Sequence, residues 1–559
     1  MRAAADMSSD LEISRQAVMK PVTDIARAAG IPEDALELYG RYKAKVDPAL
    51  VPARSTRGKV VLVTAMSPTP AGEGKSTVTV GLGDALAKAG KNTVIALREP
   101  SLGPVLGMKG GATGGGWSQV VPMEDINLHF TGDFHAITTA NNALTALLDN
   151  HIYQGNELGI DPRRITFRRV MDMNDRSLRD IVIGLGGPVQ GVPRQDGFDI
   201  TVASEIMAVF CLARDLADLK ERLARITVGY TYDRRPVTVR DLGVEGALTL
   251  LLKDAVKPNL VQTLEGTPAF IHGGPFANIA HGCNSVTATK MALKLGDYAI
   301  TEAGFGADLG AEKFLDIKCR LGELKPNAVV IVATIRALKM HGGVDADHLE
   351  EENVEAMLEG AKNLEKHIES IQAFHVPYIV AINKFSADTA KEVQSLLSWC
   401  KEKGYPVEES DGWARGGEGT TELARHVVEL CEEPSGYAPI YDINDTIQDK
   451  ILAIAKTIYG ADDVEYSEEA LEKIKIYISN GWDRVPVCMA KTPLSLTDDP
   501  AIKGRPEHFT IHVQDLSISR GAGFIVAYTG SILTMPGLPK QPAAIAMGID
   551  ESGNSYGIF

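Results

Sequence analysis

The sequence lacks paired cysteines, long apolar runs and an excess of positive charge. Its six cysteines lie far apart with no Cys-x-x-Cys pair, which indicates reduced thiols and not a disulfide framework. No apolar run reaches the roughly 20 residues that a membrane-spanning helix needs. The first residues carry acids early and have no apolar core of the kind found in signal peptides. We therefore expect a cytoplasmic protein.

The charge balance narrows the classes of partner. There are 57 Lys and Arg residues against 73 Asp and Glu, so 57 − 73 gives a net charge of −16. A field of this sign disfavours nucleic acid and anionic membrane as partners, and we expect neither. It leaves small anionic ligands open, since these need only a local positive potential. The 559 residues allow about two to four domains, and the 54 glycines are clustered in a few segments.

Short apolar runs alternate with helical segments, a pattern typical of an α/β fold with a parallel sheet. A strand at 59–65, a helix at 76–89 and a strand at 93–97 form a predicted βαβ unit. About seven parallel strands are predicted, the others being 298–301, 328–333, 377–382, 126–130 and a weaker run near Val407. Before them, Ser9 and Glu12 form a predicted capping box. Gly30 and Pro32 end the next helix, and a further helix is predicted over 32–45.

Two stretches depart from this alternation. Residues 152–255 carry basic pairs and a glycine turn, and we interpret them as an inserted α/β domain. After residue 434 the runs at 486–490, 509–516 and 523–528 resemble antiparallel strands, which predicts a C-terminal α+β domain over 435–559. The main domain then comprises 1–151 and 256–434.

A glycine-rich segment lies between the first predicted strand and its helix, the context of a phosphate-binding P-loop. It comprises Thr69, Pro70, Ala71, Gly72, Glu73, Gly74, Lys75, Ser76 and Thr77. Glycines let backbone N–H groups approach phosphate oxygens, Lys75 would reach the β- and γ-phosphates, and the Ser76 hydroxyl would bind Mg2+. Thr69 stands where the usual pattern has glycine. A turn without a ligand is the alternative, and a nucleotide site alone fits an ATPase switch as well as an enzyme.

Two longer segments, 107–117 and 332–343, resemble the fingerprint segments of formate–tetrahydrofolate ligases. The second matches throughout, whereas the first has Thr113 and Trp117 where alanine and tyrosine are usual. Similar stretches lie at 97–104, 267–283, 302–310 and 534–540, so the resemblance covers essentially the whole chain. The family's loop resembles TPAGEGK[ST], which accounts for Thr69.

The resemblance implies ATP-dependent ligation of formate to tetrahydrofolate, giving 10-formyltetrahydrofolate, ADP and phosphate through formyl phosphate. It implies ATP with Mg2+, tetrahydrofolate as co-substrate, K+ or NH4+ as activator, and a homotetramer. No further enzymatic domain is expected. A ligase that activates another carboxylate shares every argument about phosphate, and a substrate panel separates the two.

Site residues follow from the same segments. Lys75 is expected to neutralise the γ-phosphate. Arg98, at the end of a predicted strand, is expected to bind formyl phosphate with its two-pronged guanidinium, the alternative being a structural pair with Glu99. Glu302 could orient Mg2+ or water, or be a buried structural carboxylate. Backbone donors near 304–310 or at Gly110-Gly111 could stabilise the oxyanion of the second step.

Aromatic rings are needed to stack on the pterin, and three loop aromatics are candidates. The resemblance assigns Phe385, Trp413 and Phe305 to folate binding; without it, Phe385 and Trp413 are more often core residues. Asn383-Lys384 also follows a strand, but Ser386 replaces the aspartate of a guanine-reading motif. We therefore expect no base-reading role for Asn383.

Overall fold

A twelve-stranded sheet lies at the centre of the part of the chain that the structure describes. The structure is a computed structural model describing residues 9–52, 58–70, 72–108, 113–530 and 532–558. Six successive parallel pairings join seven strands of this sheet, which confirms the predicted parallel α/β core. In spatial order they are β15 (Pro268–Ile271), β4 (Thr93–Leu97), β16 (Tyr298–Glu302), β3 (Lys59–Ala65), β17 (Pro326–Ala333), β18 (Tyr378–Asn383) and β19 (Val407–Ser410).

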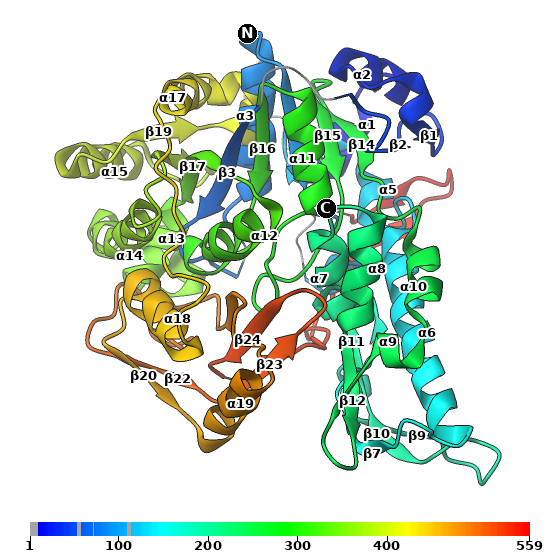
Figure 1. The fold of residues 1–559 in the computed structure, drawn as a ribbon. Coiled ribbons are helices and arrows are strands. Elements are labelled where there is room, and N and C mark those ends of the chain that lie inside the picture. The colour runs from blue at the N-terminus through cyan, green and yellow to red at the C-terminus, as the bar shows by residue number, and fades with distance from the viewer. Residues whose placement is uncertain (1–8, 53–57, 71, 109–112, 531, 559) are drawn as a thin grey trace.

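Helices cover both faces of these strands (Figure 1). Successive side chains of β3 point to opposite faces, so Val61 and Val63 enter one apolar cluster while Val60 and Leu62 enter another. The first cluster includes α3 (Lys75–Lys88) and α17 (Thr421–Glu432), and the second includes α11 (Val286–Leu295), α14 (Val354–Gln372) and α15 (Ala390–Lys403). Burial on both sides explains why β3 is a continuous apolar run.

The strand predicted at 126–130 is wrong. This segment begins as helix α5 (Met123–Asn127), with Met123 and Ile126 buried three residues apart, which is helical spacing. The seventh parallel strand is β15, which lies within the family segment 267–283 and was not predicted as a strand. A run of a few apolar residues does not by itself distinguish a strand from a buried turn of helix.

The N-terminal segment is only partly helical. Helix α1 (Asp10–Arg15) begins with the predicted capping box, and α2 (Val22–Ala29) ends at Gly30 with a left-handed φ of 76°. The helix predicted over 32–45 is wrong, because a single 3-10 turn is followed by β1 (Leu36–Leu38) and β2 (Ala44–Val46). Strand β2 pairs with β14 (Asn259–Thr263), a partner more than 200 residues away that no local pattern reveals.

Residues 152–255 add small sheets and helices beside α6 (Asp133–Tyr153). Their strands are β7 (Ile160–Ile165), β8 (Arg169–Met171), β9 (Ile181–Ile183), β10 (Arg194–Asp196), β11 (Phe198–Ile200), β12 (Thr227–Thr231) and β13 (Pro236–Thr238). The helices are α7 (Glu205–Leu212), α8 (Leu216–Arg225), α9 (Val239–Leu242) and α10 (Glu245–Leu252). These elements lie in the lower right of Figure 1.

The C-terminal strands are mixed in direction. Strand β24 (Phe524–Tyr528) is antiparallel to β23 (Asp515–Ser519), as predicted, but parallel to β21 (Val487–Ala490), which corrects the expectation of antiparallel strands. Strands β20 (Asp463–Tyr466) and β22 (Thr510–Val513) are also parallel. Side-chain alternation is the same in either direction, so the sequence pattern could not decide this.

The predicted domain boundaries stay predictions. Ile447 of α18 (Ile447–Ile454) and Val487 belong to the same apolar cluster as Leu62 of the central sheet. The hydrophobic core therefore continues across residue 434. Helix α19 (Glu468–Ser479) packs on β23 at the far side of this region.

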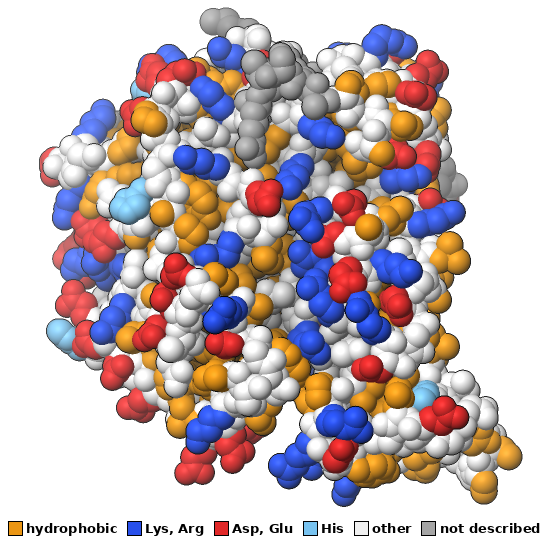
Figure 2. Space-filling model, viewed as in Figure 1, with side chains coloured by type: hydrophobic (Ala, Val, Ile, Leu, Met, Phe, Trp, Pro, Cys, Tyr) orange, Lys and Arg blue, Asp and Glu red, His pale blue; other side chains and the backbone are white. Residues whose placement is uncertain are grey.

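Charge is unevenly distributed over the surface. On the face shown in Figure 2, Lys and Arg side chains gather in a band right of centre, while many Asp and Glu side chains lie along the left margin. A negative net charge thus coexists with local positive potential. Within the described ranges, no helix is both long and apolar enough to cross a membrane.

Candidate functional site

The carboxyl ends of the parallel strands bring the predicted site residues to one edge of the sheet. The loop from Thr69 to Thr77 follows β3, Arg98 follows β4, and Glu302 ends β16. Thr334 follows β17 and Asn383 ends β18. Ligands of open α/β sheets bind at this edge, because loops from neighbouring strands converge there.

The glycine-rich loop makes two sharp turns before helix α3. Gly72 and Gly74 have φ values of 78° and 70°, a left-handed conformation that glycine adopts without strain. Helix α3 begins at Lys75, so its first N–H groups and the positive end of its dipole face the loop. The arrangement suits a bound anion. Of the predicted nucleotide-binding residues, Ala71 lies outside the described residues.

The side chain of Glu73 turns back into the loop and accepts hydrogen bonds within it. Its carboxylate accepts a hydrogen bond from the Thr69 N–H at 2.6 Å and another from the Thr334 hydroxyl. The side chain is buried, and desolvation raises the pKa of its carboxyl, with Arg336 acting in the opposite direction. Glu73 therefore fastens the loop to the end of β17.

Lys75 and Ser76 are the first residues of α3 and lie beside Glu302. The Ser76 hydroxyl donates to Glu302 Oε2 at 2.8 Å, and the Glu302 side chain is almost fully buried. Desolvation lowers the pKa of Lys75, while the charge of Glu302 raises it and that of Arg98 lowers it further. No ion-pair partner lies within 4 Å of the Lys75 ammonium among the described residues.

Arg98 lies over the backbone that follows β16. A Cβ placed on Gly304 would be 2.9 Å from Arg98 Nη1, so a larger residue there would displace the guanidinium. The buried Nε of Arg98 has no hydrogen-bond partner among the described residues. Glu99 is also buried, and the charges of Asp133 and Lys45 act on its carboxyl group. Among the described residues no ion pair within 4 Å joins Arg98 to Glu99, which disfavours the alternative of a structural pair.

Two of the three predicted aromatic residues also reach this edge. Phe305 follows Gly304 with a φ of 58°, a conformation that costs energy for a bulky residue. Phe385 lies beside Gly74: a Cβ on that glycine would be 3.9 Å from the end of the ring. The guanidinium of Arg336 covers one face of the Phe385 ring, 4.1 Å from its centroid.

Trp413 lies elsewhere around the start of α3. It belongs to the short helix α16 (Gly412–Arg415), and a Cβ on Gly116 would be 2.7 Å from its ring. Trp413 is 37% exposed and lines a cavity of about 1700 Å³ that extends along α3 to its far end. Asp84, Lys88 and Glu265 line the same cavity, but Phe385 and Phe305 do not. Trp413 therefore lines a cavity beside α3 that the other two aromatic residues do not line.

Known proteins with similar sequences match the chain from end to end. The family model described as "Formate--tetrahydrofolate ligase" matches residues 8–559. A protein of that name from Arthrobacter sp. (strain FB24) is 63% identical over 561 aligned positions, which cover 99% of both chains. Another from Paenarthrobacter aurescens (strain TC1) is 64% identical over 555 positions, also 99% of both. The chain belongs to the formate–tetrahydrofolate ligase family. The relatives are thus named as ligases.

The family segment 332–343 contains residues whose roles the sequence did not reveal. Arg336, in helix α13 (Ile335–His341), donates to the carbonyl of Gly72 and stacks on Phe385. Asn383, for which no base-reading role was expected, donates from Nδ2 to the carbonyl of Glu73 at 3.0 Å. Both side chains hold the loop from outside. For Arg336 the available signal was its position in a family segment, which did not specify the contact; for Asn383 it was the position at the end of a predicted strand.

Proposed function

We propose that this protein ligates formate to tetrahydrofolate with ATP, forming 10-formyltetrahydrofolate, ADP and phosphate through formyl phosphate. A formate oxygen attacks the γ-phosphorus and the bond to ADP breaks. N10 of the folate then attacks the formyl carbon, the bond to phosphate breaks, and N10 loses its proton. The observation that carries the proposal is the juxtaposition of Lys75, Arg98 and Glu302 at the end of three neighbouring strands, in a chain of this family.

The loop from Thr69 to Thr77 is the proposed P-loop. Its N–H groups would hold the ATP phosphates, and the Lys75 ammonium would neutralise the charge that builds up on the transferred group. Bound phosphate would favour the charged form of Lys75, whose pKa desolvation lowers. Ser76 Oγ and the Glu302 carboxylate offer oxygen atoms of the kind Mg2+ prefers, so these residues fit the ion that accompanies ATP. When bound, Mg2+ would supply charge neutralisation at the phosphates.

Arg98 is proposed to hold the activated formyl group. No described residue accepts a hydrogen bond from its Nε, and from its place over Gly304 the guanidinium would donate two parallel hydrogen bonds to a phosphate. Holding formate and the γ-phosphate in one orientation is worth about 7–11 kcal/mol in well-ordered reactions. The Gly304 N–H already donates to the Gly282 carbonyl at 3.0 Å, so the donor to the oxyanion of the second step is proposed among the other backbone N–H groups of 304–310. The alternative donors, Gly110 and Gly111, lie outside the described residues.

The pterin is proposed to stack on Phe385 and Trp413, with Phe305 nearby. Phe385 adjoins Gly74, and Trp413 adjoins the first turn of α3, so both flank the proposed phosphate site. Base-like rings gain about 1–3 kcal/mol from such stacking. Folate would then lie with N10 toward Arg98.

Further proposals follow from the family. K+ or NH4+ would act as an activator, and the chain would form a homotetramer in the cytoplasm without nucleic acid or membrane as a partner. Light scattering of the purified protein measures the assembly directly. Rates in K+, NH4+ and Na+ measure the activation.

The reaction is tested by ADP release in the presence and absence of each substrate. We expect ADP only when formate and tetrahydrofolate are both present. ADP release indifferent to both would contradict the proposal and favour an ATPase switch. A panel of acetate, glycine and bicarbonate in place of formate tests whether another carboxylate is the substrate.

A further inference from the structure

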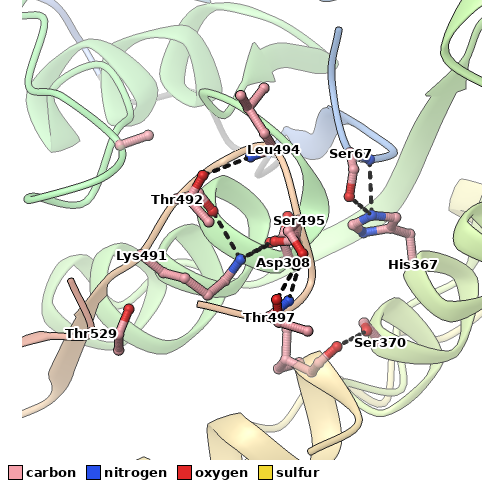
Figure 3. A network of polar contacts seen from close by, with 12 residues as sticks. Ser67, Asp308, His367, Ser370, Lys491, Thr492, Leu494, Ser495, Thr497 and Thr529 are labelled. Atoms are coloured by element: carbon pink, nitrogen blue, oxygen red, sulfur yellow. Dashed lines mark hydrogen bonds and ion pairs between the residues drawn. The ribbon is translucent and has the colours of Figure 1, made fainter. Parts of the chain in front are cut away.

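Ser67 lies between the end of β3 and the glycine-rich loop, and histidine rings bond both of its backbone polar groups. Its N–H donates to His367 Nε2 at 2.9 Å, as Figure 3 shows. Its carbonyl oxygen lies 3.1 Å from His341 Nε2. Ser67 is completely buried, so these groups have no water to replace a lost partner. The two histidines come from α13 and α14, which follow β17.

The partners of each ring decide which nitrogen carries the proton. The Gly504 N–H donates to His341 Nδ1 at 3.1 Å, so Nδ1 must be unprotonated. The single ring proton is then on Nε2, where it is donated to the Ser67 carbonyl. His367 has the opposite arrangement, because its Nε2 accepts from Ser67. Burial lowers the pKa of both rings to about 4, in keeping with neutral rings.

The C-terminal segment 491–504 reaches this strand end at two places. Asn363 Nδ2 donates to the Gly504 carbonyl at 2.8 Å and to Ser67 Oγ at 3.2 Å. Lys491 and Asp308 form a fully buried ion pair at 3.0 Å, next to His367 in Figure 3. Both links fasten residues far along the chain to the base of the loop. The Gly504 link is the one that fixes the His341 proton.

We propose that His341 is a positioning residue for the phosphate loop, which it holds by donating its Nε2 proton to the carbonyl of Ser67. Ser67 is two residues before Thr69, so its peptide sets the direction in which the loop leaves β3. The inference rests on the proposed function, since it takes Thr69–Thr77 to bind ATP. It adds a residue that touches no substrate but orients the groups that do.

Two substitutions of His341 separate its two hydrogen bonds. In His341→Gln, the side-chain amide nitrogen can occupy the place of Nε2 and still donate to Ser67. In His341→Asn, the shorter amide can occupy the place of Nδ1, accept from Gly504 and no longer reach Ser67. His348→Gln is the control, because His348 is an exposed histidine whose ring pairs with the neighbouring Glu351. Melting temperatures of all variants report the effect on folding.

We expect His341→Asn to raise the KM for ATP about three- to tenfold, the worth of one hydrogen bond, with the KM values for formate and tetrahydrofolate unchanged. His341→Gln and the control should keep the wild-type KM for ATP. Equal KM shifts in the Gln and Asn variants, or a wild-type value in Asn, would overturn the inference. If the Asn variant does not fold, a raised KM for ATP in the Gln variant overturns it and a normal one supports it. Failure of the proposed function is distinct: the wild-type protein would then lack formate-dependent ADP release.

Discussion

The charged and the aromatic residues of the candidate site lie on different kinds of secondary structure. The charged group, defined as Lys75, Ser76, Arg98 and Glu302, lies within one residue of a strand end or a helix start. The aromatic group is defined as Phe305, Phe385 and Trp413. Phe305 and Phe385 lie on connecting segments, whereas Trp413 lies in the short helix α16 and lines a cavity that the other two do not line. The register of the sheet fixes the positions of the charged residues relative to one another. The position of each aromatic residue depends instead on the separate segment that carries it.

This difference in support matches the different demands of phosphoryl transfer, proposed for the charged group, and of folate binding, proposed for the aromatic group. Charge stabilisation in phosphoryl transfer requires positions accurate to a fraction of an ångström, which paired strands supply. Stacking tolerates small displacements, because a ring offers a broad apolar face. We therefore expect substitutions in the charged group to lower turnover, and substitutions in the aromatic group to weaken binding of the folate.

The largest effect is expected for Lys75→Ala. Removing the ammonium leaves the charge of the transferred group uncompensated, and turnover should fall about 10³-fold or more. Formate-dependent ADP release measures this, with circular dichroism to verify the fold. Lys362→Ala is the matched control, since Lys362 is an exposed lysine of α14 paired with Glu359. Turnover near the wild-type rate in Lys75→Ala would break the assignment of the charged group.

Arg98→Lys should lower turnover by about 10²- to 10³-fold, although the charge is kept. A lysine cannot present two parallel donors to a phosphate, so the loss reports the guanidinium geometry. The measurement is kcat at saturating formate, ATP and tetrahydrofolate, compared with Arg98→Ala. Equal rates in Arg98→Lys and the wild type would show that Arg98 acts only through its charge.

Trp413→Ala should raise the KM for tetrahydrofolate about 5- to 150-fold and leave the KM for ATP unchanged, because about 1–3 kcal/mol of stacking is lost. Trp413→Phe should restore most of the affinity. Phe385→Ala tests whether both rings hold the same ligand. A rise in the KM for ATP alone would place the pterin away from Trp413 and break the division between the two groups.

The smallest effect concerns the stability of the folded protein in acid. It tests His341, which supports the loop that carries Lys75 and Ser76. Burial lowers the pKa of His341 from 6.5 to about 4, so the unfolded chain binds a proton that the folded chain does not between these values. The wild-type protein should therefore lose about 2 kcal/mol of stability at pH 5 through this residue.

His341→Gln removes that loss, so the stability difference between variant and wild type should shift in favour of the variant as pH falls from 7 to 5. Urea unfolding at several pH values measures it. His348→Gln, at an exposed position, provides the reference slope. A constant difference between His341→Gln and wild type across this range would contradict a neutral buried ring.

The parallel sheet was predictable because its strands are buried on both faces and are therefore continuous apolar runs, as in β3 and β17. The loop was predictable because strand, glycines, Lys75 and helix follow one another in the sequence. Strand β2 was not predictable, because its partner β14 lies over 200 residues away in the sequence. The direction of β21 relative to β24 was not predictable either, because the alternation of side chains is the same in parallel and antiparallel strands.

The sequence by itself determined which residues we propose for the chemistry: the glycines and Lys75 of the loop, and Arg98 in its family segment. Only the tertiary structure decided which of them meet. In the structure, Glu73 and Asn383 hold the loop by hydrogen bonds, and Glu302 accepts a hydrogen bond from Ser76. His341 donates to the carbonyl of Ser67. The reason is that strand order, here β4-β16-β3-β17-β18, places distant segments side by side, and hydrogen bonds depend on that adjacency and not on spacing along the chain.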